Sequence, residues 1–235
     1  MKFTISVFLS LIIAFSSVLL CDEYSEMREE MVEEQIVKRG ITNKRVIDAF
    51  LKVKRHLFVD MKYRKDSYKD YSLAIGEGQV IDRPYIVAMM TYVIAPDYDK
   101  KVLEIGTGSG FHAAILAELV KNVYTIENLP QLSKKAENLL RSIGYGNIHF
   151  RIGDGALGWK ENAPFDGIIC TYSPDHIPPD LLEQLSPGGK MIIPVSYSSK
   201  VQEFILIEKK EDGSFKRTIL IPVPFTPLIR GPDEQ

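Results

Sequence analysis

Between residues 101 and 195, the sequence alternates short apolar segments with segments of helical pattern. The apolar segments read KVLEIG, NVYTIE, IHFRIGD, FDGIICTY and GKMIIPV, and helical stretches such as FHAAILAELV and LPQLSKKAENLLRSIG lie between them. Strands separated by helices need crossover connections, and these join strands that run parallel. Near the C-terminus, VQEFILIEKK and FKRTILIPV flank the turn EDGS, which is a hairpin signal. The sequence therefore predicts an α/β fold with a doubly wound, mostly parallel sheet and an antiparallel C-terminal edge.

The segment before this alternation predicts helices that cap the larger domain. Apolar residues recur at helical spacing before Gly40, which is expected to end one helix, and Thr42 or Asn43 can cap the next. The polar segment MKYRKDSYKDYSLAIGEGQ has no clear period and reads as a loop. Pro84 then suits the first turn of a further helix, YIVAMMTYVI.

The N-terminus has a different composition. Lys2 precedes eighteen residues without a charge, FTISVFLSLIIAFSSVLL, and acidic residues follow Cys21. This order is typical of a secretory signal peptide or a signal anchor. We therefore expect an exported or periplasmic protein, or one tethered to the membrane only through this segment, with a cytoplasmic protein as the alternative. The expected boundaries are 1–21 for this segment, 22–235 for a single domain, 22–70 for its helical cap and loop, and 71–235 for its α/β core.

Charge and cysteine content argue against several classes of partner. The formal net charge is −2 and the basic residues are dispersed, so the chain lacks the electrostatic footprint of a nucleic-acid-binding protein. The two cysteines, Cys21 and Cys170, form no CxxC pair, and the four histidines show no ligand spacing. We expect no metal site, no nucleic-acid partner and a monomeric protein.

A glycine-rich turn follows the segment KVLEIG. Gly106, Gly108 and Gly110 form GxGxG between a predicted strand and a predicted helix, which is where nucleotides bind in sheets of this kind. A dinucleotide-binding turn has its third glycine at the position of Phe111, and no phosphate-binding GxxxxGK[ST] is present. Phosphate binding is therefore not supported, and a plain structural turn stays open as the alternative.

Acidic residues at the ends of three predicted strands indicate the ligand. Glu104 immediately precedes the glycines, where its carboxylate can face a cation. Glu127 closes the second strand, a position suited to accepting hydrogen bonds from both ribose hydroxyls. Asp154 and Gly155 end the third strand, where a side chain and a backbone N–H can contact an adenine edge. An adenosine with a positive centre and no pyrophosphate describes S-adenosylmethionine, which we expect as the cofactor.

The motifs EIGTGSG, YTIE, GDG, FDGIICT and LLEQLSPGGKMIIPV resemble those of class I methyltransferases. The flanking segments MVEEQIVKRGITNKRVIDAFLKVKRHLFV, AIGEGQVIDRPYIVAMMT and FTPLI resemble the protein-L-isoaspartate O-methyltransferase family, from about residue 27 to residue 230. The resemblance implies methylation of the α-carboxylate of isoaspartyl residues in damaged proteins or peptides. The N-terminal apolar run is not part of the family pattern, whose members are usually cytosolic.

The resemblance also implies roles for single residues. The positions implied to hold or cover the cofactor are Gly78, Gln79, Val80, Glu104, Gly106, Gly108, Gly110, Glu127, Asp154 and Gly155. The positions implied to line the peptide channel are Ile81, Thr171, Pro194 and Val195. Thr171 is equally consistent with an ordinary hydroxyl at a strand end, and Pro194 with a residue that only marks where a strand stops.

One position departs from the family pattern at the acceptor site. The family typically reads GQTIS where this chain has GQVID, so Asp82 replaces a serine whose hydroxyl can donate to the acceptor carboxylate. An ionised Asp82 cannot donate and repels that carboxylate, unless it takes up a proton or is neutralised by Arg83. Alternatively, Asp82 points away and caps the helix that starts at Pro84.

The sequence therefore predicts a protein-L-isoaspartate O-methyltransferase whose turnover is weakened by Asp82. Two alternatives stay open. One is an enzyme of the same fold that methylates a different carboxylate acceptor. The other is an exported binding protein that has lost turnover because of Asp82.

Overall fold

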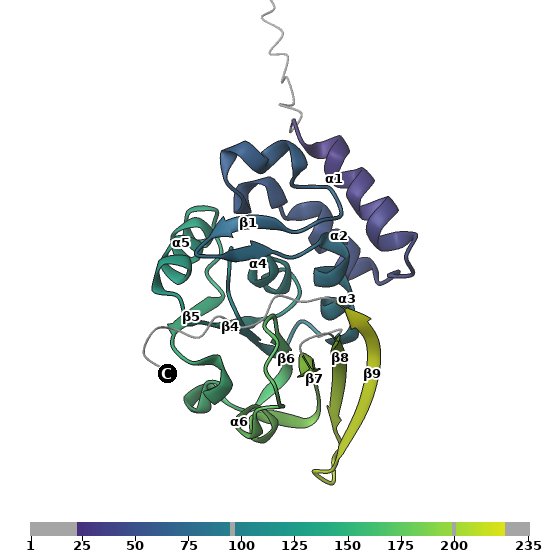
Figure 1. The fold of residues 1–235 in the computed structure, drawn as a ribbon, viewed down its shortest axis with the longest axis vertical. Coiled ribbons are helices and arrows are strands. Elements are labelled where there is room, and N and C mark those ends of the chain that lie inside the picture. The colour runs from purple at the N-terminus through teal and green to yellow at the C-terminus, as the bar shows by residue number, and fades with distance from the viewer. Residues whose placement is uncertain (1–22, 95–96, 199–200, 224–235) are drawn as a thin grey trace, which may run out of the picture.

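A seven-stranded sheet forms the centre of the molecule. The computed structural model describes residues 23–94, 97–198 and 201–223. The strands lie in the order β5-β4-β3-β6-β7-β8-β9, the first five parallel and the last two antiparallel to their neighbours. This confirms the predicted α/β class and its antiparallel edge (Figure 1). The bounds are β3 Lys101–Ile105, β4 Asn122–Glu127, β5 Ile148–Ile152, β6 Phe165–Cys170, β7 Leu185–Ser198, β8 Val201–Lys209 and β9 Phe215–Val223.

Both faces of the parallel strands are buried, which is why they read as apolar runs in the sequence. Neighbouring residues of β3 belong to two separate core clusters, with Val102 in one and Leu103 in the other. Helices from the N-terminal half cover the first face, and α6 covers the second. The helices of the α/β core are α3 Pro84–Ile94, α4 Phe111–Ala117, α5 Pro130–Ser142 and α6 Pro179–Glu183.

An N-terminal cap lies at one end of the sheet, in the upper half of Figure 1. Its helices are α1 Ser25–Val32, which continues into the π-helical turn η1 Glu33–Val37, and α2 Lys44–Lys52. The 3₁₀ turns η2 Arg55–Phe58 and η3 Met61–Asp66 follow. A two-stranded hairpin then forms from β1 Leu73–Gly76 and β2 Gln79–Ile81.

The loop predicted for MKYRKDSYKDYSLAIGEGQ is therefore wrong in part, because it contains η3 and β1. The two hairpin strands have four and three residues, too few to show a period of two in the sequence. Between them, Gly76, Glu77 and Gly78 all have positive φ (103°, 50° and 69°), which makes the tight reversal.

Residues 1–22 and the closing FTPLI lie outside the described residues, so the predicted targeting segment stays a prediction. Within residues 23–94, 97–198 and 201–223, no helix combines the length and the apolar character that a membrane span requires. In the same ranges, no three histidine, cysteine or acidic side chains gather as a metal ion would need.

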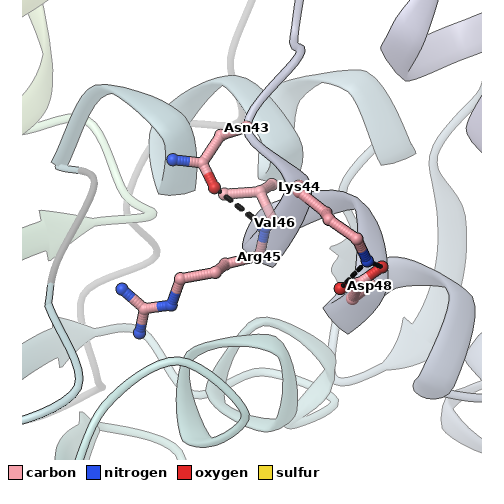
Figure 2. Close-up of polar contacts among 5 residues, drawn as sticks. All are labelled: Asn43, Lys44, Arg45, Val46 and Asp48. Atoms are coloured by element: carbon pink, nitrogen blue, oxygen red, sulfur yellow. Dashed lines mark hydrogen bonds and ion pairs between the residues drawn. The ribbon is translucent and has the colours of Figure 1, made fainter.

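Of the two residues that the sequence predicts as the N-cap of α2, Thr42 and Asn43, it is Asn43 that caps the helix. Its Oδ1 accepts hydrogen bonds from the backbone N–H groups of Arg45 (3.0 Å) and Val46 (3.3 Å), as Figure 2 shows for Val46. The exposed Lys44 forms an ion pair with Asp48 one turn on, at 2.6 Å. This N-cap fixes the residue at which α2 begins. Helix α2 carries the buried Phe50, whose ring packs edge-on against Phe111 at the start of α4, with the ring centroids 5.9 Å apart.

We expect Asn43→Ala to lower the free energy of unfolding by about 1 kcal/mol, because two backbone donors lose their acceptor. Lys44→Ala is the matched control in the same turn, and it is expected to change stability by less than about 0.5 kcal/mol, since its ion pair is exposed. Urea denaturation followed by circular dichroism measures both. Equal losses for the two variants would contradict the capping role.

Candidate active site

A pocket opens at the carboxyl ends of β3, β4 and β6, beneath strand β2 of the cap. Its empty space, with the open mouth included, is about 970 Å³. Most of the residues predicted to bind a ligand line it together: Gln79, Val80, Ile81, Asp82, Glu104, Gly106, Gly108, Glu127, Asp154, Gly155 and Thr171. The sequence prediction of a site at the crossover of a parallel sheet thus corresponds to a real cavity.

The glycine turn needs glycine for two different reasons. Gly106 has a φ of 96°, and a Cβ there would lie 2.2 Å from Oγ1 of Thr171, so no side chain fits between β3 and β6. Gly110 has a φ of 84°, and its Cβ would lie 2.8 Å from Leu140 of α5. Gly110 does not line the pocket, and neither does Gly78 of the hairpin turn. Gly110 therefore allows α4 to pack closely against α5, and Gly78 allows the chain to reverse in the hairpin; neither residue contacts the cavity.

Glu127 shapes the turn as well as facing the pocket. Its side chain is buried at 6% exposure, and its two oxygens accept from the backbone N–H groups of Gly108 (2.8 Å) and Leu129 (3.1 Å). A carboxylate oxygen has two lone pairs, so each oxygen keeps capacity for one more donor. Glu127 is thus held rigidly with acceptor capacity left for a ligand.

Glu104 is the most unusual group in the pocket. It is fully buried, and its Oε2 accepts from the Thr125 hydroxyl (2.6 Å), which lies 2.7 Å from the Thr107 hydroxyl. Oε1 of Glu104 has no hydrogen-bond partner among the described residues. Burial raises the pKa of Glu104 to about 8; the hydrogen bond from Thr125 acts in the opposite sense, and the charge of Glu127 adds to the rise. A buried carboxyl with a free oxygen fits a ligand that brings a positive charge or N–H donors.

Asp154 and Gly155 lie at the other side of the pocket, after β5. The Asp154 side chain is exposed, and its Oδ1 accepts from the N–H of Ala156 (2.8 Å), which starts the turn η4 Gly155–Leu157. A Cβ on Gly155 would lie 2.1 Å from a methyl carbon of Ile105, so η4 approaches β3 too closely for any other residue. This approach brings Asp154 to the cavity wall.

Thr171 lines the pocket, but its hydroxyl proton already has two acceptors. It donates to the carbonyls of Ile105 (3.0 Å) and Gly106 (2.9 Å), and so ties the end of β6 to the glycine turn. Pro194 and Val195, which were predicted to line a peptide channel, are buried within β7 and do not reach the pocket. The reason is that β7 does not end there: it continues to Ser198, paired with β8.

Asp82 faces the pocket and makes no helix-capping bond. The backbone N–H groups of Ile86 and Val87 bond to the carbonyl of Arg83 instead, and no hydrogen bond to the Asp82 carboxylate is seen within the described ranges. Burial raises the pKa of Asp82 to about 7, although the positive charges of Arg55 and Arg83 pull it down. The carboxyl of Asp82 therefore titrates much closer to neutral pH than an ordinary aspartate does.

Arg55 was not foreseen as part of this region. It is fully buried, with Nη2 donating to the backbone carbonyl of Asp82 and Nε to that of Ser67, both at 2.6 Å. Burial lowers its pKa to about 9, which the charge of Asp82 counteracts. The segment RHLFV carried no signal for this contact, because Asp82 lies twenty-seven residues further along the chain. His112 and Tyr172, which also line the pocket, were missed as well.

Comparison with known proteins identifies close relatives. Residues 26–232 match the family model "Protein-L-isoaspartate(D-aspartate) O-methyltransferase". Protein-L-isoaspartate O-methyltransferase 1 of Nitrosospira multiformis is 46% identical over 211 residues, covering 89% of each chain. Protein-L-isoaspartate O-methyltransferase 2 of Geotalea uraniireducens is 48% identical over 202 residues, covering 86% of this chain and 93% of the relative.

Solved structures give the same picture of the fold. A protein-L-isoaspartate O-methyltransferase structure aligns with a TM-score of 0.79 and 26% identity, covering 86% of this chain and 66% of the other. A Plasmodium falciparum protein described as a putative enzyme of this kind, in complex with S-adenosyl-L-homocysteine, aligns with a TM-score of 0.75 at 20% identity. That alignment covers 87% of this chain and 99% of the other.

We expect the buried carboxyl of Glu104 to make the unliganded protein less stable as pH rises. A carboxyl whose pKa is raised in the folded state stabilises the fold at pH values below its ordinary pKa, and this contribution is lost as pH rises toward 8. Glu104→Gln removes the titration, so the loss of unfolding free energy between pH 5 and 8 should shrink by at least about 1 kcal/mol. Urea unfolding at several pH values measures it. An unchanged pH slope would show that Glu104 does not titrate in this range.

Proposed function

The chain belongs to the protein-L-isoaspartate(D-aspartate) O-methyltransferase family, and we propose that it methylates the α-carboxylate of isoaspartyl residues in damaged proteins, with S-adenosylmethionine as donor. The observation that carries the proposal is the pocket itself. It gathers the glycine turn, Glu127 and the buried Glu104 beneath the hairpin strand that leads to Asp82.

The residues present fit the donor. Glu127 has acceptor capacity for the ribose hydroxyls, and Asp154 and Gly155 stand where the adenine would lie. The free Oε1 of Glu104 suits the cationic part of the molecule. When bound, S-adenosylmethionine supplies a methyl group on a positively charged sulfonium. Gly106 and Gly108 line the pocket without side chains, so a ligand can lie directly against the backbone there.

Methyl transfer to a carboxylate requires mainly that the protein position the two reacting groups. The acceptor carboxylate is ionised at neutral pH, so no general base is needed. The site has to hold that carboxylate in line with the methyl group and keep water away. Val80 and Ile81 of β2 bring apolar side chains to the pocket wall, and Asp82 follows them at the same wall. We assign the placing of the acceptor to this segment.

Asp82 supports acceptor binding only in its protonated form. A protonated carboxyl can donate a hydrogen bond to the acceptor, whereas an ionised one repels it. The positive charges of the buried Arg55 and the neighbouring Arg83 offset part of that repulsion, so we expect turnover to be weakened and not lost.

The direct test of the function uses two peptides that differ only in their aspartyl linkage. We expect labelled methyl groups to pass from S-adenosylmethionine to a peptide with an isoaspartyl linkage and not to its normal aspartyl counterpart. Transfer to another small carboxylate, with none to the isoaspartyl peptide, would favour an enzyme of different acceptor specificity. Donor binding without any transfer would favour a binding protein.

We expect the rate on the isoaspartyl peptide to fall about tenfold between pH 6 and pH 8, as Asp82 loses its proton. Asp82→Ser restores a hydroxyl donor that does not titrate, so its rate should exceed that of the parent above pH 7 and vary less with pH. Asp82→Asn, which also cannot ionise, is the control for charge alone. Donor affinity is measured by calorimetry alongside. A rate for Asp82→Ser no higher than the parent's, at equal donor affinity, would show that Asp82 is no obstacle.

We also propose that residues 1–21 carry the chain out of the cytosol or tether it to the membrane, and that the protein works as a monomer. Lys2, the uncharged run and the acidic sequel support the targeting role. A reporter that is active only outside the cytosol, fused after residue 235, should therefore be active. Recovery of intact, full-length, soluble protein from the cytosol would contradict targeting.

The monomer is tested by size-exclusion chromatography with light scattering. A dimer in that measurement would contradict it.

A further inference from the structure

Arg55 lies one layer behind the wall of the pocket. Its side chain is fully buried, and its guanidinium carbon lies 4.8 Å from the centroid of the Phe111 ring, which lines the pocket. Nη2 donates to the backbone carbonyl of Asp82 and Nε to that of Ser67, both at 2.6 Å. These two bonds fix the guanidinium beside Asp82, the residue that follows strand β2, while Arg55 itself does not line the cavity.

The third nitrogen of this guanidinium is left without an acceptor. Nη1 of Arg55 is buried and has no hydrogen-bond partner among the described residues. A guanidinium carries five N–H donors in a fixed fork, and two of them belong to Nη1. Buried polar groups in native proteins are nearly always paired, because leaving them unpaired is costly. An anionic acceptor that reaches Nη1 in one state of the site would offset this cost.

The carboxylate of Asp82 is the acceptor that the geometry supplies. It has no hydrogen-bond partner among the described residues, and the backbone carbonyl of the same residue already accepts from Nη2. Nη1 and Nη2 belong to one rigid fork, so rotation of the Asp82 side chain to another rotamer can bring a carboxylate oxygen to Nη1 while the backbone stays in place. Such a hydrogen bond between charged groups is about twice as strong as one between neutral groups. Ionised Asp82 therefore has a partner on the side away from the cavity.

The charge of Arg55 is the main positive charge that acts on Asp82. It lowers the pKa of Asp82 more than the charge of Arg83 does, and Asp82, Tyr68 and Asp70 in turn raise the pKa of Arg55. The other titratable side chains that line the pocket are Glu104, His112, Glu127, Asp154 and Tyr172.

We propose that Arg55 is a positioning residue of the acceptor site, whose Nη1 binds the ionised carboxylate of Asp82 and holds it away from the acceptor. Asp82 then turns toward the acceptor only in its protonated form, in which it can donate a hydrogen bond. This inference rests on the proposed function, because it takes the carboxylate of an isoaspartyl residue as the acceptor. The pair explains how an aspartate at this position is compatible with turnover.

The first test compares pH profiles of methyl transfer to the isoaspartyl peptide, measured on the full chain. Arg55→Gln keeps an N–H donor for the carbonyl of Asp82 but removes the charge, so the pH at which the rate has fallen by half should rise by about one unit. Arg55→Lys keeps the charge and should leave that pH close to the parent's. In the Asp82→Ser background no group titrates at this position, so Arg55→Gln should not change the shape of the profile there. A loss of rate that is the same at every pH, or equally large in both backgrounds, would overturn the proposal, because it would show that Arg55 only supports the fold.

A second readout needs neither activity nor a variant of Arg55 that might fold poorly. In parent protein labelled with ¹⁵N-arginine, the Nη1 resonance of Arg55 should shift between pH 6 and pH 8, as Asp82 ionises and binds it. In Asp82→Asn, which cannot ionise, the resonance should stay in place over the same range. A resonance that does not move in the parent, or that moves equally in Asp82→Asn, would overturn the pairing while leaving the proposed function intact. Absence of methyl transfer by a parent in which the resonance does move would overturn the proposed function, and with it the role of the pair in acceptor binding.

Discussion

The burial of Glu104 is the constraint on which the rest of the site depends. A carboxyl at the end of the central strand β3 is cut off from water. Within the part of the chain that the structure describes, it receives one side-chain hydrogen bond, from Thr125 on β4, and its second oxygen has no partner. A protein keeps such a group at a cost in stability, because desolvation of a charge is expensive. A cationic ligand bound in the adjoining pocket would offset this cost, because its positive charge stabilises the ionised carboxylate of Glu104.

The segment that follows hairpin strand β2 gives the pocket a second buried carboxyl with a raised pKa, that of Asp82. Asp82 reaches the cavity because Arg55, buried in the cap, holds the backbone of Asp82 through its carbonyl. The two acids then serve different ends of the reaction in our account: Glu104 faces the donor, and Asp82 faces the acceptor. Burial raises the pKa of both carboxyls. The charges of Arg55 and Arg83 lower the pKa of Asp82, and no cationic side chain among the described residues does this for Glu104.

Much of the fold was predictable because its signals are local. The parallel strands are apolar on both faces, Asn43 offers a short polar side chain just before a helix, and the glycine turn follows a strand directly. What was missed depends on contacts far along the chain. The hairpin β1–β2 is too short to show a period, and the path of β7 past Val195 is set by pairing with β8. His112 contacts Thr91, which lies twenty-one residues earlier in the chain.

We expect the buried Glu104 to become ionised when the cationic donor enters the pocket. The direct measurement is the number of protons released when S-adenosylmethionine binds at pH 7, obtained by calorimetry in buffers of different ionisation enthalpy. Because burial raises the pKa of Glu104 to about 8 in the empty pocket and a cation favours its charged form, the parent should release more protons than Glu104→Gln does. Equal proton release by the parent and Glu104→Gln, at measurable affinity in both, would contradict the account.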